Sequence, residues 1–193
     1  MATSTKAPRI KFSHLGLVVR DIEMMQAFYT DVLGFAVTDK GTTGQGATMT
    51  FMTLDPEEHH QVFLVDGRPE TLPSNTVIPG ASPVLHHLSF RMEALADLRA
   101  MYERLKAASD RKIRTVTHGL CWALYTEDPE GNQLEFFADT PWYVYQPFYE
   151  PIDFAKSDDE LMRETEAMCR KADGFRAHAD FNRELEQRVP RGG

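Results

Sequence analysis

The feature that most constrains the fold is an order of secondary-structure elements that occurs twice. Hydrophobic spacing predicts a strand, a helix and three short strands in the first half of the chain, and the same order in the second half. These elements are expected at 9–19, 22–33, 35–38, 47–54 and 60–65, and then at 86–92, 93–108, 112–117, 120–125 and 133–137. The repeat predicts an α+β protein whose two βαβββ modules form a curved, mostly antiparallel, cup-shaped sheet.

The repeat also sets the expected boundaries. Residues 1–8 are expected to be flexible, 9–140 to form one domain with modules at about 9–67 and 84–140, and 141–193 to form a C-terminal aromatic and helical arm. The proline-rich stretch 67–83 between the modules is expected to be a linker or a loop over a site.

The arm belongs to neither module. Its aromatic segment, 142–149, could wall a pocket, but we expect it to serve packing or chain association instead. Ser157 and Glu160 form a capping box for a helix to about residue 171, and a second short helix is expected at about 175–187.

The first strand predicts where its histidine lies. Phe12, His14, Gly16 and Val18 share one face of the strand by alternation, and the leucines and valine between them share the other. Because both faces are largely apolar, we expect both to be covered and His14 to lie inside.

Charge and cysteine content exclude several classes of protein. The formal net charge is -8 and there is no basic run, so neither nucleic acid nor an anionic membrane is an expected partner. No signal-peptide or membrane-spanning stretch is visible, and a cytoplasmic protein is expected. Cys121 and Cys169 are too few for a disulfide framework, and Cys121 is expected to be a packed apolar residue.

One carboxylate lies in an apolar hairpin. The turn Asp128-Pro129-Glu130-Gly131 joins the run 120–125 to the strand 133–137, where Glu135 is flanked by leucine and phenylalanines. Glu135 either points to solvent by alternation or is buried, and a buried carboxylate needs a partner such as a metal ion.

Histidines at the start of each module favour the metal. His14 lies in the first strand of the first half, and His86 and His87 in that of the second. If the modules form one sheet, His14, His87 and Glu135 can converge. Two imidazoles and one carboxylate form a facial triad that is typical of non-haem Fe(II).

The hairpin is similar to a known signature. Its pattern is a histidine, a spacer, an apolar residue with tyrosine, then an acidic residue with proline, a glycine and a glutamate, here His118, Leu124-Tyr125, Asp128-Pro129, Gly131 and Glu135. This pattern and the paired modules resemble type I extradiol ring-cleaving dioxygenases of the vicinal oxygen chelate superfamily, in a form with a single module pair.

The resemblance implies a function and a metal site. It implies a dioxygenase that opens the ring of a catechol next to the diol with O2. Fe(II), or Mn(II) in its place, is then held by His14, His87 and Glu135. His86 is expected to be a neighbour of the ligand His87, because alternation directs it to the opposite face of the strand.

The resemblance also implies three catalytic residues. His60 resembles the acid/base histidine, and its competitor His59 is expected to be an exposed residue at the loop end. His118 and Tyr125 resemble the two donors that orient the bound substrate and oxygen. A homodimer or larger homo-oligomer is expected.

Two other functions stay open. One is a metal-dependent isomerase or lyase of the glyoxalase kind, which shares the module pair but usually needs another carboxylate ligand. The other is a non-catalytic small-molecule-binding protein of the same fold. Well-known ring-cleaving members carry an extra N-terminal module pair, which is missing here, and the resemblance covers about 9–140. The substrate is therefore not defined by the sequence.

Overall fold

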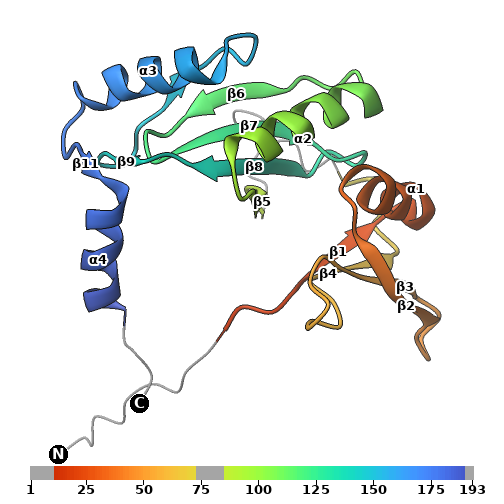
Figure 1. Cartoon of the computed structure of the whole chain (residues 1–193). Coiled ribbons are helices and arrows are strands. Elements are labelled where there is room, and N and C mark those ends of the chain that lie inside the picture. The colour runs from red at the N-terminus through yellow and green to blue at the C-terminus, as the bar shows by residue number, and fades with distance from the viewer. Residues whose placement is uncertain (1–10, 73–84, 190–193) are drawn as a thin grey trace, which may run out of the picture.

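The repeated order of elements is present in the structure, a computed structural model that describes residues 11–72 and 85–189 (Figure 1). The expected flexible residues 1–8 and most of the loop 67–83 lie outside the described residues. Module 1 consists of β1 (Leu15–Val19), α1 (Ile22–Ala27), the π-helix η1 (Phe28–Val32), β2 (Ala36–Thr42), β3 (Thr48–Thr53) and β4 (Val62–Asp66). Module 2 consists of β5 (Leu88–Arg91), α2 (Leu95–Ala108), β6 (Arg114–Thr117), β7 (Cys121–Glu127) and β8 (Gln133–Asp139).

Each module forms its own sheet. The strand orders are β1-β4-β3-β2 and β10-β6-β7-β8-β5, where β10 (Glu150–Pro151) comes from the arm. In both modules the first strand runs parallel to the last, and the other pairs are antiparallel. The α+β class with mostly antiparallel sheets is therefore confirmed. Among the described strands no pair joins the two sheets, so β1 and β5 are each an edge strand with one neighbour.

The helices and one shared core hold the modules together. Asp21 begins α1 as expected, because its carboxylate accepts a hydrogen bond from the Met24 amide at 2.9 Å. The single helix expected at 22–33 is instead divided into α1 and η1.

Buried side chains of both modules form one apolar cluster, which includes Leu17, Met25, Tyr29, Leu98, Leu134 and Phe136.

The turn between β7 and β8 docks module 2 on module 1. The Glu130 carboxylate accepts hydrogen bonds from the backbone amides of Arg20 at 2.6 Å and Asp21 at 3.0 Å, and its other oxygen lies 3.4 Å from the Arg68 guanidinium. The Tyr29 hydroxyl donates to Asp128 at 3.4 Å. Both carboxylates are buried, so the turn that the sequence presents as an ordinary surface turn fixes how the modules sit together.

Asp128 makes this docking sensitive to pH. Burial is the main cause that raises the pKa of Asp128 to about 6. The hydrogen bonds that Asn132 and Glu130 donate to its carboxylate lower the pKa, but by less. A carboxyl group whose pKa is higher in the folded state stabilises the fold below its unfolded pKa, and that contribution is lost as pH rises through about 6.

We therefore compare the free energies of unfolding of the native protein and of Asp128→Asn. The native value minus the variant value should fall by up to about 3 kcal/mol between pH 4 and 7. Urea denaturation of both proteins across that range measures the difference. A difference that stays constant or grows with pH would contradict the raised pKa.

The face of β1 that carries His14 is uncovered by any described segment. His14, Gly16 and Val18 are exposed, and Val18 retains 55% of its accessible surface. The opposite face, with Leu17 and Val19, is buried under the helices. The expectation that both faces are covered and that His14 lies inside is therefore wrong, because the module helices cover one face of each sheet.

The arm folds against module 2 (Figure 1). Its short strands β9 (Trp142–Tyr143) and β11 (Arg176–Ala177) pair with each other, and β10 adds to the edge of β6. Helix α3 (Asp158–Cys169) begins at the capping box of Ser157 and Glu160, as expected, and α4 (His178–Arg188) follows. No helix among residues 11–72 and 85–189 is long and apolar enough to cross a membrane.

Both cysteines are packed thiols. Cys121 on β7 and Cys169 on α3 are buried and free, which confirms the expectation for Cys121. Burial, with a smaller contribution from the charge of Glu135, raises the pKa of Cys121 to about 12. At neutral pH this thiol is therefore protonated and unreactive.

Candidate functional site

Glu135 lies at the centre of a polar cluster on module 2. It is buried with 8% exposure, and the β-ladder places it opposite Tyr125. The Tyr125 hydroxyl donates to one carboxylate oxygen, and the Ser89 hydroxyl donates to the other at 2.5 Å. Nε2 of His87 lies 3.2 Å from that second oxygen. Glu135 therefore lies buried among its partners beside Ala123 and Tyr125, and does not point to solvent.

His118 extends this cluster towards the arm. Its Nε2 lies 2.9 Å from the Tyr125 hydroxyl oxygen, and its Nδ1 donates to the Phe148 carbonyl at 2.8 Å, since a carbonyl can only accept. Burial, then the hydrogen bond and charge of Glu135, raise the pKa of Tyr125 far above its ordinary value. Tyr125 is therefore a neutral phenol that can donate a hydrogen bond at any ordinary pH.

The arm supplies part of this site. The Gln146 side chain donates to the His118 carbonyl at 2.8 Å and accepts from the Phe148 amide at 3.2 Å, so it holds the segment that receives His118. The ring of Tyr149 lies 5.7 Å from that of His118, with 50% of its surface exposed. We expected the aromatic segment to serve packing, but Tyr149 lies open beside His118. A backbone carbonyl acceptor has no sequence signal, so only the aromatic content could have indicated this role.

Three histidines, His14, His59 and His60, gather on module 1. His14 precedes β1 and His60 precedes β4, and their ring centroids are 4.3 Å apart. Nε2 of His59 lies 2.8 Å from the Asp39 carboxylate, and its Nδ1 lies 2.8 Å from that of His60. His59 is exposed, as expected. Desolvation, followed by the neighbouring His14 and His59, lowers the pKa of His60, so its imidazole is neutral at neutral pH.

His86 and His87 differ from the expectation in one respect. Strand β5 begins at Leu88, so neither histidine lies within it, and their Nδ1 atoms are 2.6 Å apart. The expectation that alternation directs them to opposite faces is therefore wrong. His87 is still the one that meets Glu135, and the Nδ1 contact with His86 leaves its Nε2 directed at the carboxylate.

Two of the three expected ligands fit a metal centre within one chain. The His87 imidazole and the Glu135 carboxylate are donor types that divalent iron and manganese bind, and they already converge. The third expected ligand, His14, lies with His60 on module 1. Across the described residues, no three His, Cys, Asp or Glu side chains come together as a metal site.

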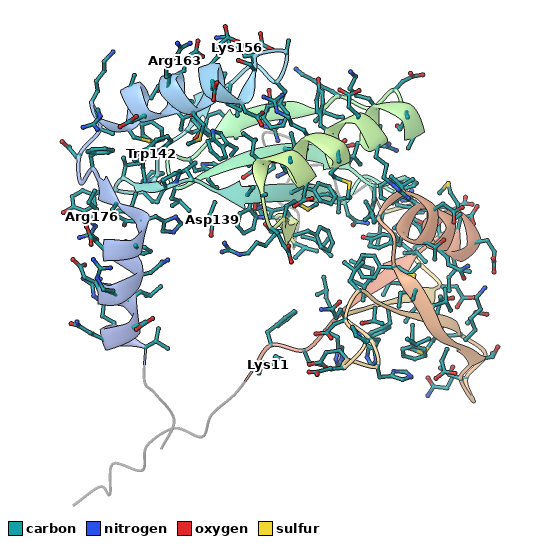
Figure 2. All side chains as sticks on the ribbon, in the orientation of Figure 1. Lys11, Asp139, Trp142, Lys156, Arg163 and Arg176 are labelled. Carbon is teal, nitrogen blue, oxygen red and sulfur yellow. The ribbon has the colours of Figure 1, made fainter. Side chains whose placement is uncertain are left out.

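Figure 2 shows Lys11, on the segment that leads to β1, well apart from Asp139, which ends β8. Trp142 and Arg176 mark the paired strands of the arm beside module 2.

A comparison with protein families assigns the chain to a superfamily. The sequence profile of the Glyoxalase/Bleomycin resistance protein/Dioxygenase superfamily matches residues 11–136, which include both modules. The chain belongs to this superfamily. The vicinal oxygen chelate resemblance is therefore confirmed at the level of the family.

Similar proteins include two biphenyl-diol dioxygenases. Biphenyl-2,3-diol 1,2-dioxygenase 2 of Rhodococcus globerulus is 36% identical over 130 residues, which cover 67% of this chain and 63% of that protein. Biphenyl-2,3-diol 1,2-dioxygenase 3 of the same organism is 33% identical over 135 residues, which cover 70% and 65%. The chain thus matches slightly less than two thirds of the length of these relatives.

A solved structure supports the fold. The glyoxylase/bleomycin resistance protein/dioxygenase domain from Frankia sp. EAN1pec superposes with a TM-score of 0.57 at 23% identity, and covers 69% of this chain and 100% of that domain. At this identity the similarity shows the shared fold alone.

Proposed function

We propose that this superfamily member is an extradiol dioxygenase, which opens the ring of a catechol-type substrate next to the diol and incorporates both atoms of O2. The observation that supports it best is the chain of contacts from His118 through Tyr125 to Glu135, beside His87. The names of the relatives point to the same chemistry. The proposed metal is Fe(II), with Mn(II) as the alternative, and the proposed ligands are His14, His87 and Glu135.

The bound metal would act as a template for the diol and O2 and as a Lewis acid. The protein residues supply the other functions. Tyr125 stays protonated, and its single O–H, which donates to Glu135 in this structure, is proposed to donate to a substrate oxygen instead when that carboxylate binds the metal. The Phe148 carbonyl orients His118 so that its Nε2 lies beside the Tyr125 hydroxyl. His60 is the proposed base, because a neutral imidazole can accept a hydroxyl proton and later return it.

The test is anaerobic addition of Fe(II) and a catechol to the purified protein, followed by air. A yellow ring-opened semialdehyde chromophore is the expected result with simple, substituted or biaryl catechols. Absence of the chromophore across that series, with iron bound, would reject the dioxygenase.

Replacing His60 separates catalysis from metal binding. We expect His60→Phe to lower kcat by about 100- to 10,000-fold, the usual range for a lost acid/base residue, while iron content stays near the native level. His59→Phe is the matched control and should keep most of the activity. Iron lost from His60→Phe would move His60 into the ligand set.

Tyr149 is the proposed wall for the substrate ring. Its half-exposed side chain stands beside His118, where an aromatic ring can stack or pack edge-on. We expect Tyr149→Ala to raise KM for a catechol by about 5- to 10-fold, from the loss of one aromatic contact, with iron content unchanged. Tyr145→Ala, also an exposed tyrosine of the arm, is the control. Equal effects of the two variants would reject this role.

A further inference from the structure

A small polar cavity adjoins Tyr125 on module 2, and the site described above does not use it. It has a volume of about 230 Å³. The side chains that share it with Tyr125 are polar or charged, namely Lys112, Arg114, Thr126, Glu127 and Gln133. Charged and hydrogen-bonding groups lose little when they enter such a lining, whereas an apolar group gains little from it. The cavity therefore fits a charged or strongly polar part of a ligand.

The strand register places Arg114 on the same face of the sheet as Glu135. Arg114 on β6 lies opposite Tyr125 on β7, and Tyr125 lies opposite Glu135 on β8. Figure 1 shows these three strands side by side. Directly opposite residues of an antiparallel ladder project to one face, and two strand spacings put the backbones of Arg114 and Glu135 about 10 Å apart. A benzene ring with a short side chain can span this distance.

The Arg114 guanidinium is oriented by neutral groups. It donates to the side-chain oxygen of Gln133 at 3.2 Å, and its Cζ lies 5.3 Å from the centre of the Tyr125 ring. An amide and an aromatic face hold a guanidinium in place without cancelling its charge. Because Gln133 accepts through its oxygen, its amide nitrogen remains a donor. Arg114 is exposed, so a ligand can reach it from solvent.

The positive charge of the cavity is not balanced within the described part of the chain. There, neither Lys112 nor Arg114 forms an ion pair with a carboxylate. The carboxylate of the lining, Glu127, lies 3.0 Å from Arg111 and is already paired. The whole chain has a formal net charge of -8. The cavity is therefore a positive region on a negatively charged protein, which attracts an anionic group to this position.

A carboxylate is the anionic group that this arrangement fits. Arginine binds a carboxylate through two parallel N–H···O hydrogen bonds, and a lysine beside it adds a point charge. The Tyr125 hydroxyl bonds Glu135, while Arg114 lies over the ring of the same tyrosine. One ligand can therefore place its diol at the hydroxyl end of Tyr125 and an acid group at Arg114.

We propose that the substrate is a catechol that carries a carboxylate on a short side chain, and that Arg114 and Lys112 bind this carboxylate. The inference rests on the proposed function for the diol end of the substrate. The acid end rests on the cavity alone. Neutral catechols, including biaryl ones, lack the contact with Arg114 and bind more weakly.

Two ligands of nearly equal size test the charge preference. These are 3,4-dihydroxyphenylacetate and its amide, titrated into the native protein with Fe(II) in a calorimeter under anaerobic conditions, so that no turnover occurs. The acid should bind about 10- to 100-fold more tightly than the amide, the usual effect of a hydrogen bond to a charged group. Equal affinities for the acid and the amide would overturn the proposal.

Replacing Arg114 should remove this preference. Arg114→Met keeps an aliphatic stem over Tyr125 but loses the charge, so the Kd of the acid should rise by about 10- to 100-fold. The Kd of the amide should stay within about threefold, which also shows that the variant is folded. Arg114→Lys should retain part of the preference, because it keeps the charge but not the planar fork.

The matched control removes a positive charge elsewhere on module 2. Lys106 on α2 pairs with Glu103 at 3.2 Å, and Lys106→Met should leave the Kd of both ligands unchanged. If Arg114→Met weakens the acid and the amide equally, Arg114 only supports Tyr125, and the carboxylate subsite is overturned.

Admission of air separates this proposal from the dioxygenase proposal. Acid-selective binding that depends on Arg114, without ring opening in air, supports the subsite and rejects only the reaction. Ring opening of the acid and the amide with equal affinities supports the reaction and overturns the subsite. Native protein that binds neither ligand overturns the subsite as well.

Discussion

Replacing Glu135 with alanine should lower the affinity of the protein for Fe(II) by more than about 100-fold, since even loss of a residue that only supports a ligand costs about 10- to 100-fold. Glu135 is the buried carboxylate that three side chains already orient, through Tyr125, Ser89 and His87. Without it, the two remaining proposed ligands are neutral imidazoles. Equilibrium dialysis against Fe(II) under anaerobic conditions measures the change.

Two further variants show whether the carboxylate itself is responsible. Glu135→Gln keeps the volume and one acceptor oxygen but loses the charge, and should also bind iron poorly. Glu127→Ala removes a carboxylate from the same hairpin that pairs with Arg111 at 3.0 Å, and should bind iron normally. Iron affinity that survives in Glu135→Ala would reject the proposed triad.

The second large effect is on stability. Replacing Glu130 with alanine should reduce the free energy of unfolding by about 3–5 kcal/mol, because removing one partner of a buried ion pair leaves the other groups desolvated. The affected groups are the Arg68 guanidinium and the amides of Arg20 and Asp21. The side chains of Arg68 and Glu130 are 7% and 3% exposed, so solvent does not replace the lost contacts. Urea denaturation followed by circular dichroism measures the loss.

The control again comes from the same hairpin. Glu127→Ala breaks a pair whose side chains are 33–37% exposed, so the expected loss is about 0–1 kcal/mol. If both variants lose the same small amount, the turn does not fix the docking of the modules.

Local sequence patterns predicted the features that depend on residues close together in the chain, namely the elements, the helix caps and the hairpin. The order of strands and helices follows from hydrophobic spacing, and the Asp21 and Ser157 caps follow from side chains that bond the next backbone amides. The neighbourhood of Glu135, Tyr125 and His118 was also predictable, because a tight turn brings the two strands of a hairpin into register.

The docking of the modules was not predictable in the same way. Whether His14 meets His87 depends on contacts more than a hundred residues apart, such as that of Glu130 with Arg20. The turn 128–131 has the composition of a surface turn, and its sequence does not show that Asp128 and Glu130 are buried. The acceptor for His118 is the Phe148 carbonyl, which every residue type carries.

The turn 128–131 also affects how this family is recognised from sequence. Part of the pattern that marks the hairpin, Asp128 and Gly131, lies in the turn that docks module 2 on module 1. A chain can keep this turn while its catalytic residues change. Sequence searches that weight these positions will therefore find proteins with the same module arrangement, and the side chains around Glu135 are needed to group them by reaction.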